Sequence, residues 1–193
     1  KNVKVNHGPL QMIQPEIEKL KTLAALNLNN NHLRSVPEAI SSLEFLLELK
    51  LANNMLNDLP SKIWGMGLVY LELDNNNISR ISKHISSAQS LTTLLLSNNS
   101  VTTLPKELGD TNLIWITLDG NNLSSIPEHM LNLHGSLYSL LVQNQNITSL
   151  PEDDNQEMGP FGVSNSNRNA FSCVDPTWST LLLLIICPPL AII

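Results

Sequence analysis

Leucine recurs at a nearly constant spacing along most of this chain, and that periodicity restricts the possible folds more than any other feature. The pattern L-x-x-L-x-L-x-x-N-x-L begins at Leu23 and returns at residues 46, 68, 91, 113 and 137, in steps of 22 to 24 residues. A partial copy lies one step earlier, with Val3, Val5 and Leu10 at its apolar positions. One such unit cannot bury its apolar side alone, so neighbouring units must stack into a solenoid.

The composition agrees with a folded chain whose core is aliphatic. Of the 193 residues, 36 are leucine and 24 are asparagine, and 42% are hydrophobic although only 4% are aromatic. The net charge of −6 argues against a nucleic-acid ligand, because binding phosphate groups requires a basic surface. Cys173 and Cys187 are too few for a disulfide framework, so the core cannot depend on one.

The second half of each unit also has a common pattern, in which a Leu-Pro-like pair precedes an apolar residue. The pairs are Val36-Pro37 with Ile40, Leu59-Pro60 with Ile63, Leu104-Pro105 with Leu108, Ile126-Pro127 with Met130, and finally Leu150-Pro151. The third unit departs from this pattern, because it has Ile81-Ser82 before Ile85. Over roughly four fifths of the chain, these features together resemble the leucine-rich repeat family.

That resemblance implies an α/β fold, a leucine-rich repeat solenoid curved like a horseshoe. The parallel β-sheet would lie on the concave face, with short 3₁₀, extended or helical returns behind it. Units of 23 residues with Leu-Pro look like those of Ras-group signalling proteins. The single step of 24 residues is the length commoner in extracellular relatives, so the subclass stays open.

The motif also predicts local structure from its residues alone. The two leucines of L-x-L are two positions apart, so they face the same side of an extended strand. The asparagine that follows marks a turn, where its amide can satisfy backbone groups that the bend leaves open. In a stack, these side chains would form a ladder from coil to coil, which we predict for Asn31, Asn54, Asn76, Asn99 and Asn121. Gln145 takes this place in the last unit.

The residues between the leucines should point outward from the concave face, where they can contact a ligand. Aromatic side chains among uncharged polar ones are typical of interface centres, and Trp115 has no place in the repeat core. We therefore predict that a protein or peptide ligand binds a strip formed by Tyr70, Glu72, Asp74, Leu95, Trp115, Thr117, Asp119 and Leu141. The alternative is that Trp115 and the two leucines are ordinary apolar residues of the surface.

The sequence contains no arrangement typical of an active site. No phosphate-binding, dinucleotide-binding or G-x-S-x-G motif occurs. The five histidines lack the spacing of metal ligands, and they are His7, His32, His84, His129 and His134. We expect no catalytic residue, no metal and no cofactor, and hence no enzymatic activity.

The chain changes character after the repeats, which occupy residues 1–152 as one partial and six full units. Residues 153–177 are polar, as expected of a linker with little capacity for a core. Residues 178–193 are apolar and uncharged, although Pro188-Pro189 would interrupt a helix. This segment fits a truncated transmembrane helix, a removable signal for a glycolipid anchor, or an apolar cap on the last repeat. Capping segments are amphipathic and this one has no polar side, so we expect membrane association.

Four positions fit the acceptor pattern for N-glycosylation, namely Asn77, Asn98, Asn122 and Asn146. Three of them directly follow the ladder position, where the repeat itself imposes similar residues, so they are not independent signals. Together with the apolar tail they favour a membrane-tethered recognition module at the cell surface. The alternative is a cytosolic signalling scaffold of the Ras-group type, in which the tail is a cap. An upstream secretory signal in the full reading frame would discriminate between the two.

Overall fold

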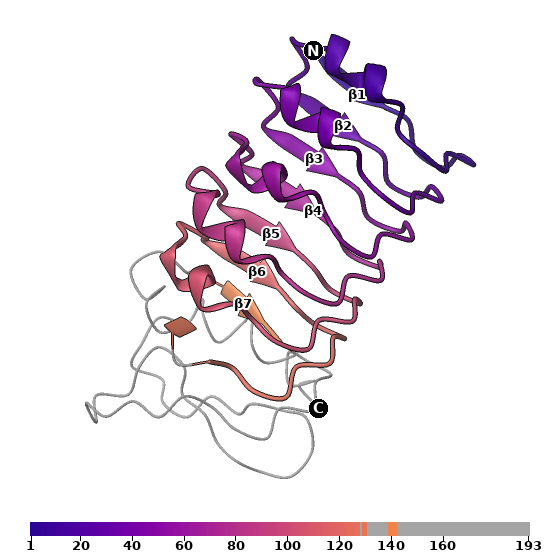
Figure 1. The fold of residues 1–193 in the computed structure, drawn as a ribbon. Helices are drawn as coiled ribbons and strands as arrows, with labels where there is room; N and C mark the ends of the chain where they lie inside the picture. The colour runs from indigo at the N-terminus through magenta and orange to yellow at the C-terminus, as the bar shows by residue number, and fades with distance from the viewer. Residues whose placement is uncertain (128, 131–138, 143–193) are drawn as a thin grey trace, which may run out of the picture.

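The computed structural model describes residues 1–127, 129–130 and 139–142. In these residues each coil contributes one short strand to a single parallel sheet of seven strands, which lie in sequence order from β1 to β7 (Figure 1). The strands are β1 (Asn2–Lys4), β2 (Ala25–Asn27), β3 (Glu48–Lys50), β4 (Tyr70–Glu72), β5 (Thr93–Leu95), β6 (Trp115–Thr117) and β7 (Ser139–Leu141). The expected leucine-rich repeat solenoid is therefore confirmed, with its strands where the L-x-L motif placed them.

The strands pair in register, so each central residue lies beside its counterpart in the next coil. Leu26 pairs with Leu49, Leu49 with Leu71, and Leu71 with Leu94. This register stacks equivalent leucines in rows, and one continuous cluster, aliphatic except for Trp64, runs through the stack. The predicted core leucines are buried, with exposed fractions of 0% for Leu73, 1% for Leu96 and 0% for Leu118.

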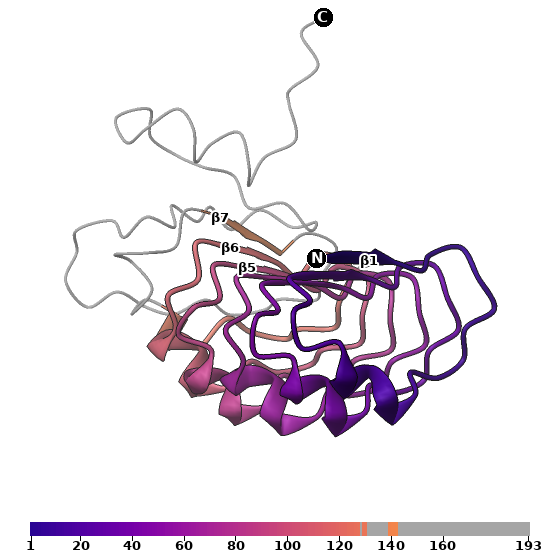
Figure 2. The ribbon, with the colours of Figure 1, turned by 90° about the horizontal axis from the view of Figure 1, so that it is seen from above.

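The return segments form 3₁₀ helices of five residues on the side opposite the sheet (Figure 2). These helices are η1 (Pro15–Lys19), η2 (Glu38–Ser42), η3 (Ser61–Gly65), η4 (Lys83–Ser87) and η5 (Lys106–Asp110). Proline immediately precedes η2, η3 and η5, where its fixed φ suits the turn into the helix. The apolar residue three positions later is buried in each case, as for Ile40 and Leu108.

The third full unit keeps the same return without its proline. Ser82 takes the position before η4 with φ −67°, and its side chain accepts a hydrogen bond from the His84 amide at 3.3 Å. Ile85 is then buried as its counterparts are. A side-chain cap therefore replaces the conformational restriction that proline supplies elsewhere.

The asparagine after each strand from β2 to β6 bonds its own coil to the preceding one. The Asn76 amide nitrogen donates to the Leu73 carbonyl of its own coil at 2.9 Å and to the Leu51 carbonyl of the preceding coil at 3.0 Å. The Asn76 amide oxygen accepts from the backbone amide of Leu56 at 3.0 Å. The same three kinds of contact recur at Asn31, Asn54, Asn99 and Asn121.

A second row of residues, one position before the ladder, adopts a left-handed backbone. The row consists of His7, Asn30, Asn53, Asn75, Asn98 and Gly120, with φ between 55° and 64°. Asparagine tolerates this conformation better than most residues, and glycine adopts it without a steric penalty. The high asparagine content thus has two structural causes, and the Asn-Asn and Gly-Asn pairs were a signal for the second.

The partial repeat at the N-terminus forms a coil of its own, with β1 and η1 (Figure 1). Gly8 occupies its ladder position, so this coil has no amide side chain there. The ladder nevertheless reaches it, because Asn31 donates to the Val5 carbonyl at 2.8 Å and accepts from the Leu10 amide at 3.3 Å.

The predicted linker, residues 153–177, and the apolar segment, residues 178–193, lie outside the described residues. Within residues 1–127, 129–130 and 139–142, no helix is long and apolar enough to cross a membrane. The expectation of membrane association therefore stays a prediction from the sequence.

Candidate recognition surface

The outward residues of the strands and of the positions just after them form one surface, here called the sheet face. Three columns cross it from coil to coil, because the strands are paired in register. From β2 to β6 the first column holds Ala25, Glu48, Tyr70, Thr93 and Trp115. The second holds Asn27, Lys50, Glu72, Leu95 and Thr117, and the third holds Asn29, Ala52, Asp74, Ser97 and Asp119.

The middle of the sheet face is a cluster of charged and aromatic side chains around Tyr70. The Lys50 ammonium lies 5.0 Å from the centre of the Tyr70 ring and 4.0 Å from the Glu48 carboxylate. Burial raises the pKa of Tyr70 to about 12, and the negative charges of Glu72 and Asp74 act in the same direction. The phenol therefore stays neutral at physiological pH, and Lys50 is held by two neighbours on its own surface.

Asp74 combines a place on the sheet face with a structural contact. Its carboxylate accepts a hydrogen bond of 2.6 Å from the backbone amide of Ser97 in the next coil. Burial raises the pKa of the Asp74 carboxyl, the Ser97 hydrogen bond opposes that shift, and the charge of Glu72 adds to it. Asn29 has the equivalent contact two coils earlier, because its side chain accepts from the Ala52 amide at 2.8 Å.

The predicted strip differs in exposure along its length. Tyr70, Glu72, Asp74, Leu95 and Asp119 are all partly exposed, and so is Trp115. Trp115 is partly exposed and does not belong to the buried core.

Thr117 keeps its place in the second column, but it is covered more than a ligand-binding residue would be. It is only 8% exposed, and its hydroxyl accepts from the Leu96 amide at 3.3 Å. Its side chain thus contributes to the contact between β5 and β6. Leu141 lies beside Thr117 in the register of β6 and β7.

The predicted strip did not include Asn29 and Lys50, although both lie in the outward columns. The Asn29 side chain donates to the Glu72 carboxylate at 3.2 Å, across two coils. Lys50 is the one cation in the outward columns of β2 to β6, so it partly offsets the negative charge of the carboxylates there. The available signal was the column itself, because both residues occupy the same repeat positions as the predicted ones.

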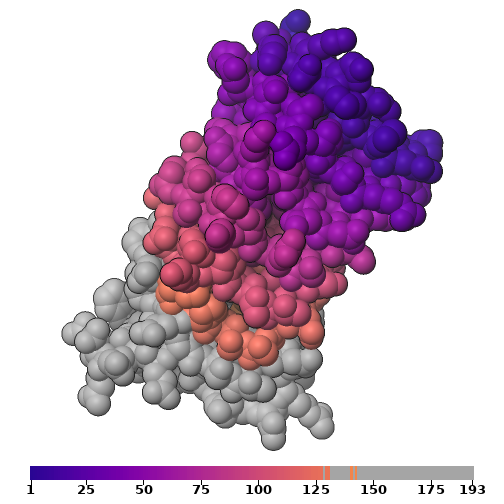
Figure 3. Space-filling model, viewed as in Figure 1, coloured from indigo at the N-terminus to yellow at the C-terminus, as the bar shows by residue number. Residues whose placement is uncertain are grey.

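Groups that could hold a metal ion were sought among the described residues. No group of three or more histidine, cysteine, aspartate or glutamate side chains is arranged to hold a metal ion there. A hollow of about 570 Å³ lies on the side of the 3₁₀ helices, which Figure 3 faces. Its lining includes Ser61, Gly65, Met66, Gly67 and His84. The hollow exists where Gly65 and Gly67 have no side chains, since a Cβ added at either glycine would meet no atom within 4 Å.

Among the predicted glycosylation positions, Asn77, Asn98 and Asn122 are exposed, and Asn146 lies outside the described residues. The Asn98 side chain already donates to the Asn75 side chain at 3.0 Å. Whether any of these positions carries a glycan stays a prediction.

Comparisons with known proteins identify the repeat. The model of a family described as Leucine Rich Repeat matches residues 22–43, which contain β2 and η2, and residues 90–110, which contain β5 and η5. No curated protein matches the chain. One similar solved structure is that of an LRR protein of Leptospira interrogans, with 27% sequence identity and a TM-score of 0.46. The match covers 78% of this chain and 50% of that one, so the chain spans about half the length of this relative.

Proposed function

Since the chain is a leucine-rich repeat protein, we propose that it binds a protein or peptide ligand on its sheet face and catalyses no reaction itself. The observation that supports this proposal is the partly exposed Trp115, which pairs in register with Thr93, as Thr93 does with Tyr70 of the charged cluster. Large aromatic side chains with neighbouring apolar and charged groups are the residues on which protein interfaces most depend. Side chains of the sheet face also lie outside the leucine core, so they can differ between proteins without altering that core.

A capture experiment tests this proposal. Trp115→Ala should abolish partner capture, because a tryptophan anchor at an interface commonly contributes about 2 kcal/mol, roughly a thirtyfold change in affinity. Lys106→Ala is the control, since Lys106 is an exposed residue of η5 on the opposite side. Thermal melts should show that both variants fold. Retention of the same partners by Trp115→Ala and wild type would refute the proposal.

We further propose that residues 178–193 tether the protein to a membrane, with the repeats exposed at the cell surface. The support is in the sequence, where no charged residue occurs from Pro176 to Ile193. The full chain should enter the detergent phase in a phase-separation assay, whereas a chain ending at Asp154 should stay in the aqueous phase. If both stay in the aqueous phase, the cytosolic scaffold with an apolar cap becomes the better interpretation. Phospholipase release from cells would identify a glycolipid anchor.

A further inference from the structure

A line of exposed apolar side chains borders the sheet face, and neither the core nor the predicted strip explains it. Leu47, Val69 and Ile114 are 48%, 40% and 45% exposed, and each immediately precedes the first residue of its strand. Phe45, two residues before Leu47, is 63% exposed. These four residues are called the flank ridge.

Backbone hydrogen bonds place the ridge residues in one column. The Val69 amide donates to the Leu47 carbonyl at 2.8 Å, and the Thr92 amide donates to the Val69 carbonyl at 3.0 Å. The Ile114 amide in turn donates to the Thr92 carbonyl at 2.9 Å. Neighbouring strands are about 4.8 Å apart, so Leu47 and Val69 lie side by side, and Ile114 follows one coil further on, beyond Thr92.

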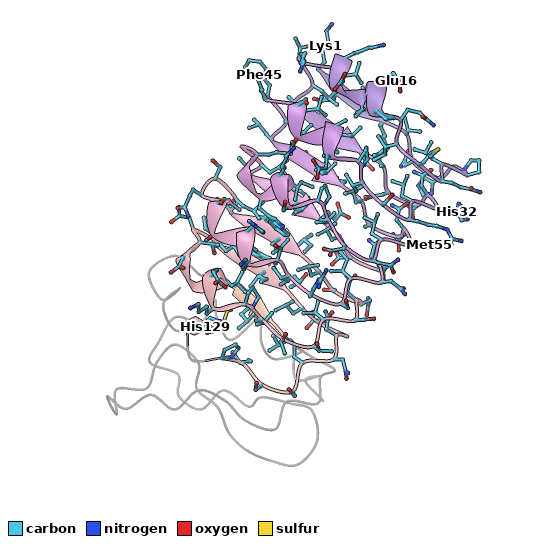
Figure 4. All side chains as sticks on the ribbon, in the orientation of Figure 1. Lys1, Glu16, His32, Phe45, Met55 and His129 are labelled. Carbon is cyan, nitrogen blue, oxygen red and sulfur yellow. The ribbon has the colours of Figure 1, made fainter. Side chains whose placement is uncertain are left out.

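The repeat does not require apolar residues in this column. Ala24 and Thr92 occupy the same position in other coils, and the fold is unchanged there. The opposite flank, where the strands end, carries the row of left-handed asparagines instead. Figure 4 shows the contrast, because Phe45 lies at one edge of the molecule, and Met55 lies at the other.

The ridge adjoins a surface whose charge is mainly negative. Leu47 is followed by Glu48, and Val69 is followed by Tyr70, in contact with Lys50 and close to the charge of Glu72. Lys50 lies close to Glu48 and the Tyr70 ring, and it is the one cation among these acidic groups. A partner that covered both surfaces would need apolar groups beside cationic ones.

We infer that the ligand surface extends beyond the sheet face onto the flank ridge, and that the partner is a protein segment with apolar side chains next to lysine or arginine. The apolar side chains cover Leu47, Val69 and Ile114, and the cations face Glu48 and Glu72. This inference rests on the proposed function, because it assumes a ligand on the sheet face. It assigns to that ligand a second contact region and a charge.

Peptides selected from a random phage-displayed library against the full chain provide the probe. The enriched peptides should combine lysine or arginine with apolar residues. The double variant Leu47→Ser/Ile114→Ser should weaken their binding about tenfold, because two apolar contacts are lost. Met55→Ser is the matched control, since Met55 is 44% exposed on the opposite flank, and it should bind as wild type does. Four substituted proteins should keep the wild-type circular dichroism spectrum: the double variant, Ile114→Ser alone, Met55→Ser and Trp115→Ala. The ridge positions are exposed, so substitutions there should leave the fold intact.

The outcomes separate the two proposals. Peptides that lose affinity for Trp115→Ala but bind the double variant as tightly as wild type overturn the flank contact and leave the proposed function standing. Peptides that bind Trp115→Ala as tightly as wild type refute the proposal that the ligand binds on the sheet face. Enrichment of acidic peptides, or of none that depend on Leu47 and Ile114, overturns the inference about the partner.

Discussion

Replacing one ladder asparagine with alanine tests whether the ladder stabilises the stack. Asn76 suits the experiment because it lies in a central coil and is 7% exposed. Asn76→Ala removes the donor to the Leu51 and Leu73 carbonyls and the acceptor for the Leu56 amide, and it leaves the aliphatic core unchanged.

The magnitude follows from those three hydrogen bonds. Their lengths lie between 2.9 and 3.0 Å, and a bond of this kind contributes about 1 kcal/mol net. A fourth contact, to the Asp74 carbonyl at 3.3 Å, is weaker. Little water can replace the lost amide, so the substitution should lower the free energy of unfolding by about 3 kcal/mol. That is a large part of the stability of a typical domain.

Urea denaturation followed by far-ultraviolet circular dichroism measures the global effect. A repeat array can unfold in parts, so a local measurement is needed as well. Hydrogen exchange of the Leu56 amide supplies it, because that amide loses its acceptor in Asn76→Ala. Its exchange should accelerate more than that of other amides in the same coil.

Asn77→Ala is the matched control, since Asn77 is the next residue in the same turn and is exposed. It should unfold at the same urea concentration as wild type. If Asn76→Ala also did so, and the Leu56 amide remained protected, the ladder would contribute nothing to stability and the reasoning would be wrong.

Three further substitutions probe the core, the turn and the sheet face. Leu96→Ala should lower the free energy of unfolding by about 2–5 kcal/mol through an interior cavity, as measured by urea denaturation. Gly120→Ala should cost about 1–3 kcal/mol in the same assay, because φ is +64° and its Cβ would collide with the Asn98 side chain. Tyr70 has a folded-state pKa of about 12, raised from 10.0 by burial and by Glu72, so it favours folding below pH 10. Wild type should lose that contribution as the pH rises from 10.0 to about 12, whereas Tyr70→Phe should not, as measured by melting temperatures across this range.

Each of these has a contrasting substitution in the same chain. Leu47→Ala removes a leucine that is 48% exposed, so it should change stability far less than Leu96→Ala. Gly65→Ala should be tolerated, because its Cβ would meet open space. Equal effects of Gly65→Ala and Gly120→Ala would show that the left-handed turn imposes no restriction. An equal alkaline decline of Tyr70→Phe and wild type would remove Tyr70 as its cause.

The scaffold was predictable because its determinants are local and repeated six times. The L-x-L spacing predicted the position of every strand from β2 to β7. The Leu-Pro-like pairs predicted where the returns η2, η3 and η5 begin. The left-handed row was not predicted, although Asn-Asn pairs recur at its positions. The predicted ladder already accounted for the high asparagine content, so a second structural role for asparagine was not predicted.

The surface was less predictable, because the motif says where a side chain starts and not what it contacts. Thr117 has the outward spacing of its column, yet its hydroxyl bonds to the Leu96 amide and it is almost buried. Conversely, Leu47 and Val69 look like extra core residues in the sequence and are exposed. These outcomes depend on neighbouring coils, which a pattern within one unit does not describe.

Some side chains of the third outward column bond to the backbone of the next coil and so stabilise the stack. The strands are three residues long, and the amide two residues beyond a strand is served in two coils by a side chain of the preceding coil. Asn29 accepts from the Ala52 amide, and Asp74 accepts from the Ser97 amide. A side chain held in this way cannot turn toward a ligand without leaving a buried amide unpaired, which costs about 1–3 kcal/mol. Discrimination between ligands should therefore depend mainly on the first two columns, where Tyr70, Leu95 and Trp115 lie, and on the flank ridge beside them.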